Sequence, residues 1–305
     1  MTRACRTDWT MTAAILAFIG FGEAAQAFCQ GWAGQHPAQV RAYDRKTDAA
    51  DSAPGKRGDY ARWGVTGAET TAAATAGASL VVSVVTADQA LAAAQAAAEA
   101  LARDTLFFDM NSVAPDTKKA AAAAVERMGA RYVDVAVMAP VHPALTRVPL
   151  LVSGPHAEAG AAALRDLGFA PRIVAGGVGR ASAIKMIRSI MIKGLEALTA
   201  ECLLSARAAG VDGEVIASLD ASFPGWDWAA RGDYNLDRML VHGQRRAAEM
   251  RESAATAAAL GQGGGMAAAT ADWQQRLGAL ALSPLPHGLA DKADAILAAT
   301  GSSAT

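Results

Sequence analysis

The sequence has few cysteines, few aromatic residues and no excess of either charge. Its 305 residues include 3 Cys and 6% aromatics, and 28 Lys and Arg stand against 29 Asp and Glu. The cysteines are too few for a disulfide framework, and none forms a CxxC metal pair. The balanced charge offers no basic surface for nucleic acid or anionic lipid. No apolar run reaches the ~20 residues that span a bilayer, so no membrane partner is expected.

Apolar residues, by contrast, are plentiful. Hydrophobic residues make up 52% of the chain and charged ones 19%. So much apolar surface offsets the entropy lost on ordering, which excludes a disordered or low-complexity chain. Histidine and acidic residues show no ligand spacing, so no metal is expected. These features are typical of a reduced, cytoplasmic, globular protein.

The amino terminus has two interpretations. Two arginines precede the apolar run 13–19, and small residues follow at 24–27, which is the outline of a secretory signal. A buried strand over 15–20 explains the same letters and also the glycines that follow it. We favour the strand, and we expect a loose tail before about Thr12.

Strand-like and helix-like segments alternate through the first half. The clearest strand is 79–86, which is continuous, β-branched and short. The remaining predicted strands are 15–20, 39–44, 106–110, 132–137, 150–153 and 172–175; the predicted helices are 23–32, 87–103, 116–128 and 157–167. The segment 46–61 suits a surface loop or a short helix. This alternation predicts an α/β fold with a mostly parallel sheet and helices on both faces.

After Gly176 the pattern becomes helical almost throughout. The segment 181–209 has no proline and a single glycine, so it predicts one long helix, and 236–260 predicts another. We therefore place a nucleotide-binding domain over 13–176 and an all-helical domain, for substrate and dimerisation, over 177–305. Alanine-rich helices make thin cores, so burial against a second copy in a homodimer is expected to complete this half.

A glycine-rich turn joins the first strand to the first helix. Gly20-Phe21-Gly22-Glu23-Ala24-Ala25 fits the G-x-G-x-x-G/A fingerprint of Rossmann-like domains. The first glycine permits the tight turn, the second lets the backbone approach a pyrophosphate, and the small third residue allows close packing. Phosphates would lie on free N–H groups at the helix start. An ordinary strand-turn-helix is the alternative.

An acidic residue supports the nucleotide interpretation. Asp44 ends the next strand 22 residues after Gly22, close to the ~20 expected for an acid that binds the ribose. Such a carboxylate accepts hydrogen bonds from ribose hydroxyls and repels a 2′-phosphate, which favours NAD. Arg45 and Lys46 can hold that phosphate, so NADP stays open, and their alternative role is as solvated loop cations. Val85 and Thr86, at the end of the 79–86 strand, complete the expected cofactor contacts.

Three further segments carry a family resemblance. The strand 106–110 leads into Asn-Ser-Val-Ala-Pro, the strand from Tyr132 ends at Ala-Pro, and Gly-Val-Gly-Arg opens the long helix. With the glycine turn, their order and spacing resemble the β-hydroxyacid dehydrogenase superfamily, which includes 6-phosphogluconate and 3-hydroxyisobutyrate dehydrogenases. The resemblance covers most of residues 13–265. The carboxyl-terminal half resembles a divergent branch with a domain of unknown function.

The resemblance implies roles for particular residues. Family members bind substrate through a Ser or Thr that follows an aspartate-ended strand, the place that Asn111 and Ser112 occupy. Their catalytic lysine follows a glycine-rich turn, as Lys185 does here. The Asn usually found four residues later is Ser189 in this chain, one helical turn from the lysine and facing the same substrate.

Two departures from the family pattern concern the substrate. The usual Ser-Gly-Gly is Met-Ala-Pro here, and Pro140 has no N–H to offer a substrate carboxylate. The later Lys-Asp pair is Ala-Glu, ending at Glu249. Arg245 and Arg246 can replace the lost cation, or they form a charged helix face with that glutamate.

Two further features are weaker candidates. His142 can contact substrate or carry protons, although loop histidines are usually structural or solvated. Trp226 and Trp228 lie in a proline-glycine loop. They either roof a pocket for a bulky or aromatic substrate or pack within a core or dimer.

Lys185 supplies the predicted chemistry. Burial and nearby cations favour neutral lysine, which can remove a hydroxyl proton as hydride leaves for the nicotinamide; reduction runs in reverse. The alternative is a solvent-facing helix lysine, the interpretation we give to Lys193. We predict an NAD(P)-dependent oxidoreductase that interconverts a hydroxy acid and its oxo acid, with an anionic small-molecule substrate. The alternatives are an imine reductase and a non-catalytic nucleotide-binding regulator.

Overall fold

The computed structural model describes residues 14–33 and 39–301, and the tail expected before Thr12 lies outside them. The chain divides into two compact units, Met1–Lys185 and Met186–Thr305. The division falls inside one long helix, past the boundary that the sequence predicts at Gly176.

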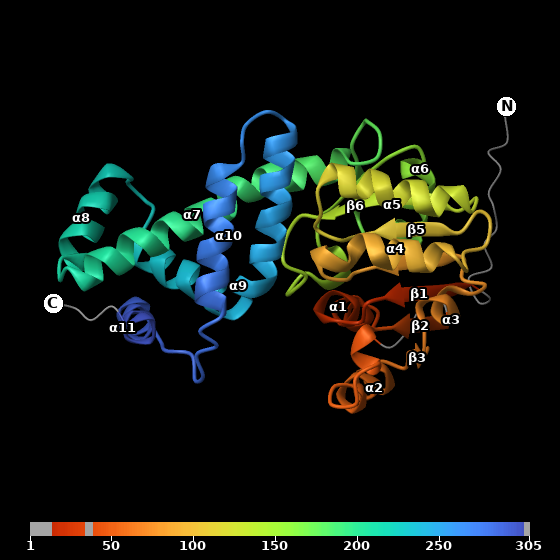
Figure 1. Ribbon diagram of the computed structural model, residues 1–305, viewed down its shortest axis with the longest axis horizontal. Coiled ribbons are helices and arrows are strands. Elements are labelled where there is room, and N and C mark those ends of the chain that lie inside the picture. The colour runs from red at the N-terminus through yellow and green to blue at the C-terminus, as the bar shows by residue number, and fades with distance from the viewer. Residues whose placement is uncertain (1–13, 34–38, 302–305) are drawn as a thin grey trace. The chain divides into compact units, whose positions relative to one another are not determined.

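In the described residues of the first unit, eight strands form one sheet (Figure 1). They are β1 (Ile15–Ile19), β2 (Gln39–Tyr43), β3 (Thr66–Gly67), β4 (Leu80–Ser83), β5 (Leu106–Asp109), β6 (Arg131–Val137), β7 (Leu150–Ser153) and β8 (Pro171–Ile173). Neighbouring pairs are parallel except β6 with β7. The predicted mostly parallel sheet is confirmed, whereas the two-residue β3 has no counterpart among the predicted strands.

The chain reverses its direction across the sheet between β1 and β4. The strand order is β3-β2-β1-β4-β5-β6-β7-β8, so the chain moves outward from β1 and then returns to β4 on the other side of β1. Ligands of such sheets bind beyond the carboxyl ends of the strands, where the order reverses. The residues that follow β1, β2 and β4 therefore flank the place where a dinucleotide binds in this fold.

Helices cover both faces of this sheet. They are α1 (Glu23–Gly31), α2 (Ala53–Arg62), α3 (Thr71–Thr75), α4 (Ala90–Ala98), α5 (Pro115–Arg127) and α6 (Ala157–Asp166). Figure 1 shows α4 and α5 side by side over one face. Phe107 packs into one hydrophobic cluster and Phe108 into the other, since successive strand side chains point to opposite faces. Burial on both faces explains why the strands are continuous apolar runs.

The second unit is helical, as predicted. The long helix α7 (Arg180–Ala208) enters it, followed by α8 (Asp212–Ser222), α9 (Trp228–Ala259), α10 (Gly265–Gly278) and α11 (Leu289–Thr300). Helix α9 begins before the predicted start at 236, because the Asp227 side chain caps it by accepting a hydrogen bond from the Ala230 N–H. None of the helices in the described part of the chain combines the length and apolarity that a bilayer crossing requires.

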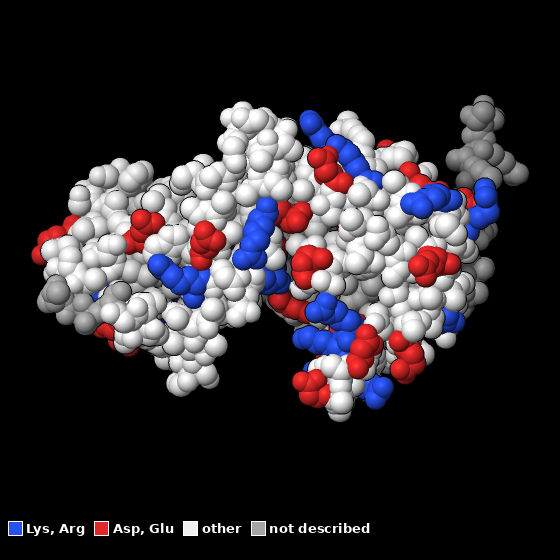
Figure 2. All heavy atoms as spheres, in the orientation of Figure 1, with Lys and Arg blue, Asp and Glu red and all other residues white. Residues whose placement is uncertain are grey.

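Helices α9 and α10 pack closely at two glycines. A Cβ atom on Gly243 would lie 2.2 Å from the Gln274 carbonyl oxygen, and one on Gly278 would lie 2.5 Å from the Gln244 nitrogen. The two backbones are therefore too close to admit a side chain. On the visible surface, charges of both signs are mixed (Figure 2), in keeping with the balanced composition.

Candidate functional site: a nucleotide turn and a lysine-serine pair

The turn after β1 depends on glycine. Gly20 has φ +83°, and a Cβ there would lie 2.7 Å from the Val84 carbonyl oxygen. A Cβ at Gly22 would meet no atom within 4 Å, so that part of the turn is open. Gly22 caps α1 without a side-chain hydrogen bond, which leaves backbone N–H groups at the helix start for an anion. Ala25 is fully buried and packs the helix onto the sheet.

Asp44 ties the turn to the end of β2. Its Oδ2 accepts a hydrogen bond from the Phe21 N–H at 2.8 Å, and its Oδ1 accepts one from the Lys46 N–H at 3.0 Å. A carboxylate has about four acceptor positions, so capacity remains for ribose hydroxyls. Arg45 is exposed beside it, as is Lys46. These residues fit an NAD(P) cofactor.

The side chain of Phe21 is not part of the exposed turn. It is fully buried and packs edge-on against Tyr60, with ring centroids 5.2 Å apart. Its N–H is already donated to Asp44. Phe21 therefore shapes the turn from the core. Glu23, by contrast, is exposed in the first turn of α1.

A buried lysine that the sequence analysis missed also shapes this turn. Lys56 of α2 donates to the Phe21 carbonyl oxygen at 2.7 Å and to Asp59 Oδ2 at 2.8 Å. In a trans peptide the C=O and N–H groups point in opposite directions. Fixing the Phe21 carbonyl toward Lys56 therefore directs the Gly22 N–H away from that lysine. The sequence predicts a surface loop or a short helix over 46–61, and no spacing of residues indicates that Lys56 is buried.

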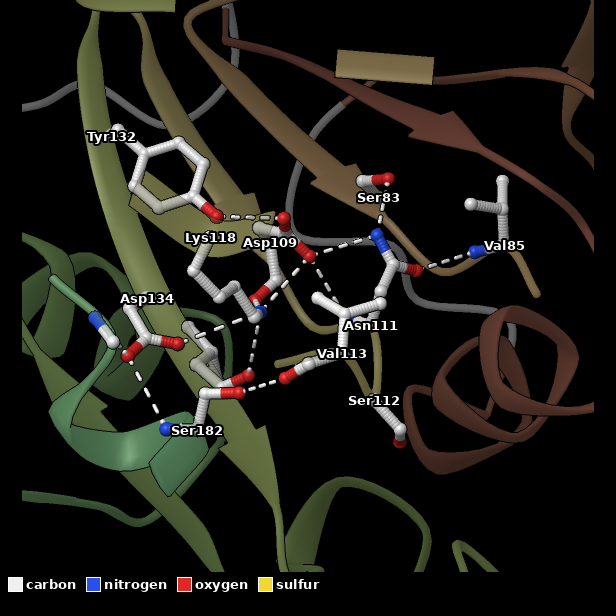
Figure 3. A network of polar contacts seen from close by, with 12 residues as sticks. Ser83, Val85, Asp109, Asn111, Ser112, Val113, Lys118, Tyr132, Asp134 and Ser182 are labelled. Atoms are coloured by element: carbon white, nitrogen blue, oxygen red, sulfur yellow. Dashed lines mark hydrogen bonds and ion pairs between the residues drawn. The ribbon is translucent and has the colours of Figure 1, made fainter. Parts of the chain in front are cut away.

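Asn111 joins the ends of β4 and β5. Its Oδ1 accepts a hydrogen bond from the Val85 N–H at 2.7 Å (Figure 3). Its Nδ2 donates to Ser83 Oγ at 2.9 Å and to Asp109 Oδ1 at 2.8 Å. The amide is buried and occupied by these contacts, so Asn111 holds the loop at Val85 in place. Thr86, the next predicted cofactor contact, is exposed.

The structure brings Lys185 and Ser112 together. Lys185 Nζ donates to Ser112 Oγ at 2.5 Å, although the residues are 73 positions apart. Ser112 follows β5, and Lys185 lies in the first turns of α7. Both side chains are half-buried. A cationic amine beside a hydroxyl can hold a substrate oxygen and exchange a proton with it.

The remaining predicted substrate residues have other partners or surroundings. His142 is exposed in the loop after β6. Ser189 is buried, and its Oγ accepts from Lys193 Nζ at 3.2 Å. Arg245 pairs with Glu249 at 2.5 Å and is 47% exposed. Arg246 is buried in an ion pair with Glu196, which also accepts from Gln274 Nε2 at 2.8 Å.

The interpretation of Lys193 as a solvent-facing lysine is wrong. Its side chain is 9% exposed, and Nζ lies 3.1 Å from Glu249 Oε2. A single lysine on α7 gives no sign of burial by itself, because the carboxylate that stabilises it comes from α9. Glu249 thus has a cation on each side, Lys193 and Arg245.

The tryptophans of the proline-glycine loop form an aromatic cluster. Trp226 stacks on Trp228 with ring centroids 5.1 Å apart, and Phe223 contacts both rings. The Arg231 guanidinium lies 4.2 Å from the Trp226 ring centroid, a cation–π contact.

Two segments match known families. Residues 15–165 match the NAD binding domain of 6-phosphogluconate dehydrogenase, and residues 206–277 match a domain of unknown function, DUF1932. No curated protein matches the chain.

Solved structures share the fold over nearly the whole chain. A conserved hypothetical protein from Sinorhizobium meliloti 1021 is 36% identical with a TM-score of 0.72, covering 98% of this chain and 100% of that one. Mycobacterium tuberculosis 3-hydroxyisobutyrate dehydrogenase, solved with L-serine, is 17% identical with a TM-score of 0.69 and coverages of 94% and 99%. An imine reductase from Myxococcus stipitatus, solved with NADP+, is 21% identical with a TM-score of 0.53 and coverages of 92% and 98%.

The similarities to the Mycobacterium tuberculosis dehydrogenase and to the imine reductase concern the fold alone, whereas the similarity to the Sinorhizobium meliloti protein extends to the sequence. The glycine turn and Asp44 lie in the matched nucleotide-binding segment, and DUF1932 covers most of the helical unit. The chain therefore belongs to the β-hydroxyacid dehydrogenase superfamily, in the branch that joins a 6-phosphogluconate dehydrogenase-like NAD-binding domain to DUF1932.

Proposed function

We propose that the protein is an NAD(P)-dependent dehydrogenase or reductase that interconverts a hydroxy acid and its oxo acid. The observation that carries the proposal is the 2.5 Å contact between Lys185 Nζ and Ser112 Oγ, in the same unit as the nucleotide turn. The bound nicotinamide supplies hydride transfer. The chain must then hold the cofactor, orient the substrate and move a proton.

The cofactor is held by backbone and by one carboxylate. The turn from Gly20 to Gly22 and the N–H groups from Glu23 to Ala25 receive the pyrophosphate. Asp44 accepts from the ribose hydroxyls, and its negative charge favours NAD over NADP. Arg45 and Lys46 are the residues that would hold a 2′-phosphate if NADP is used instead.

Lys185 acts as the proton donor and acceptor. A lysine has an ordinary pKa of about 10.4, so at neutral pH its ammonium group can donate a proton to a carbonyl oxygen during reduction. The reverse direction removes the hydroxyl proton. The Ser112 hydroxyl orients the same substrate oxygen, since it already lies within hydrogen-bonding distance of Nζ.

Four polar or cationic side chains are the candidates for binding an anionic substrate. Both predicted arginines are ion-paired, Arg245 with Glu249 and Arg246 with Glu196, and of the two Arg245 has the more accessible side chain. Ser189 and His142 are the further candidates. For a bulky or aromatic substrate, the cluster of Phe223, Trp226 and Trp228 is a further candidate contact, through its exposed edge.

We also propose a homodimer formed through the helical unit. Of the eleven exposed large hydrophobic side chains among the described residues, ten lie in Met186–Thr305. Helix α8 has no buried residue. Such concentrated apolar exposure favours association with a second copy, which would bury it.

An imine reductase is the second candidate. Pro140 stands where the family offers backbone N–H groups, so this chain has a poorer carboxylate site. Replacing Lys185 with alanine separates the two activities. Near-total loss of alcohol oxidation supports the hydroxy acid dehydrogenase, and a modest loss of imine reduction with no alcohol oxidation supports the alternative.

The first experiment is a fluorescence titration with NADH and NADPH of the wild type and Asp44→Ala. Tight NADH binding that weakens in the variant supports the nucleotide site and leads to a screen of hydroxy acids, ketones and imines, with Lys185→Ala as control. A preference for NADPH over NADH would indicate that Arg45 and Lys46 bind the 2′-phosphate. Tight binding without any turnover favours a non-catalytic regulator, and no binding of either nucleotide contradicts the proposal.

A further inference from the structure

A lysine with no exposed surface lies between two buried aspartates. Lys118, in the first turn of α5, is 0% exposed; Asp109 and Asp134 are 1% and 0% exposed. Lys118 Nζ lies 3.0 Å from Asp109 Oδ1 and 3.5 Å from Asp134 Oδ1 (Figure 3). A cation near a helix N-terminus opposes the helix dipole, and burying an ammonium group is costly. The two carboxylates stabilise it there, together with the backbone carbonyl oxygens of Asp109 and Val135.

On one side, Lys118 fixes the turn after β5. Nζ donates to the Asp109 carbonyl oxygen at 2.5 Å as well as to its carboxylate. The same Oδ1 accepts from the Asn111 N–H at 3.0 Å, and Tyr132 donates its hydroxyl to Oδ2 at 2.6 Å. Burial, followed by the Asp109 charge, raises the pKa of Tyr132 well above 10, so the phenol remains a donor. Ser112 directly follows Asn111 in the turn after β5.

On the other side, the lysine reaches the start of α7 through Asp134. Asp134 Oδ2 accepts from the Gly179 N–H at 3.0 Å, the Ser182 N–H at 3.3 Å and Ser153 Oγ at 2.9 Å. A carboxylate at a helix N-terminus is stabilised by the free N–H groups and the dipole. Asp134 therefore holds the first turn of the helix that carries Lys185.

These contacts belong to a closed ring of residues that includes Lys185 and Ser112. Ser182 donates its hydroxyl to the Val113 carbonyl oxygen, which joins α7 to the residue after Ser112. Lys185 completes the ring through its contact with Ser112 Oγ. All the members belong to the same compact unit. Lys118 bridges the two carboxylates from which both arms of the ring extend.

We infer that Lys118 is a positioning residue, which sets the distance between Lys185 Nζ and Ser112 Oγ without touching the substrate. The inference deepens the proposed function and rests on it. Without Lys118, two buried carboxylates lose their shared cation, and the turn after β5 and the start of α7 lose the ion pairs that join them in addition to the Ser182–Val113 hydrogen bond. The reacting pair then separates while the nucleotide turn after β1 keeps its own contacts.

The test compares Lys118→Met with Lys119→Met in the full chain. Lys119 is the next residue of α5, is 61% exposed and pairs with Asp116 on the surface, so it is a matched control. A double variant, Asp109→Asn with Lys118→Met, keeps the net charge of the buried group. The double variant replaces Lys118→Met in the test if the two carboxylates prevent the single variant from folding.

The first readout needs no substrate. Trinitrobenzenesulfonate modifies accessible amines, and mass spectrometry gives the rate at Lys185 relative to an exposed lysine of the same chain. We expect faster modification of Lys185 in the Lys118 variants, because Nζ is released from Ser112, and the wild-type rate in Lys119→Met. A wild-type rate in folded Lys118→Met, or in the double variant where the single one does not fold, overturns the inference.

The second readout uses the substrate that the screen identifies. We expect kcat to fall by about 100-fold in the Lys118 variants, with KM for the substrate little changed, because a displacement near 1 Å costs about that much. An unchanged kcat overturns the inference. If Lys185→Ala itself leaves turnover intact, the proposed function fails, and the modification rate alone decides the role of Lys118.

Discussion

Single residues determine the form of the turn between β1 and α1. Gly20 leaves no room for a side chain against Val84, while Asp44 and Lys56 hold opposite sides of the Phe21 residue. Asp44 receives the N–H of Phe21, and Lys56 donates to its carbonyl oxygen. The turn is thus fixed before any nucleotide binds, which reduces the entropy that binding must offset.

Replacing Lys56 with methionine weakens NADH binding. The Phe21 carbonyl then keeps the longer contact from Gln26 Nε2 at 3.4 Å, so the turn can leave the form that binds the nucleotide. Each 1.4 kcal/mol needed to restore that form costs about tenfold in affinity. Fluorescence titration measures the change. The neighbouring Arg57→Met is the control, since Arg57 is 60% exposed on the same helix. Equal affinities of the Lys56 and Arg57 variants would show that the turn holds its form alone.

The buried thiol of Cys29 will resist alkylation in the native protein. Burial raises its pKa to about 12, so at pH 8 the reactive thiolate is a minute fraction. Mass spectrometry after iodoacetamide treatment should find Cys29 unmodified in buffer and fully modified in urea. Cys202, which is partly exposed, provides the internal comparison. Rapid native labelling of Cys29 would mean that α1 opens readily.

At the scale of elements, helix pairs depend on small residues where backbones meet. Helices α9 and α10 approach so closely at Gly243 and Gly278 that any side chain forces them apart. Alanine-rich helices elsewhere bury little apolar area per residue, so the helical unit depends on such close approach. The contact of α9 with α10 is therefore expected to be sensitive to single substitutions.

Gly243→Ala should destabilise the protein by about 2–3 kcal/mol, because overpacking at a rigid backbone contact forces the helices to move. Urea unfolding followed by circular dichroism measures the free energy of unfolding. Gly213→Ala on α8 is the matched control, since a Cβ there meets nothing within 4 Å. That substitution should be neutral or slightly stabilising. Equal effects of the two would contradict the close packing of α9 and α10.

Local sequence patterns predict some of these elements and miss other features. The strand, turn and helix from Ile15 to Gly31 were predictable, because apolar periodicity and glycine spacing are local properties. The start of α9 was not, since its cap residue lies in a loop rich in aromatics. Lys56, Lys118 and Lys193 were missed as buried groups, because the atoms that stabilise each one come from other elements. Periodicity carries no signal for such long-range pairing.

At the scale of the whole molecule, apolar exposure is unequal. Met191, Leu198 and Met266 are each at least 60% exposed in the second unit, whereas Met128, at 45%, is the exposed large hydrophobic residue among the described part of the first. This asymmetry is the physical basis for expecting a homodimer through the helical half.

Met191→Lys should shift the protein toward monomer, because a charge would be buried at the contact between copies. Size-exclusion chromatography with light scattering measures the mass at several concentrations. Met128→Lys is the control and should leave the mass unchanged. A wild-type protein that is monomeric at every concentration would contradict the proposed dimer.

The two edges of the sheet have a consequence for solubility. Edge strands expose unpaired N–H and C=O groups, which can recruit a strand from another molecule. Here one edge strand, β3, has two residues, and the other, β8, begins with Pro171, which has no N–H to donate. Neither edge offers a long template for strand addition. Within the described residues, the folded nucleotide-binding unit is thus protected against strand addition at its edges, even though its interior strands are among the most apolar segments of the chain.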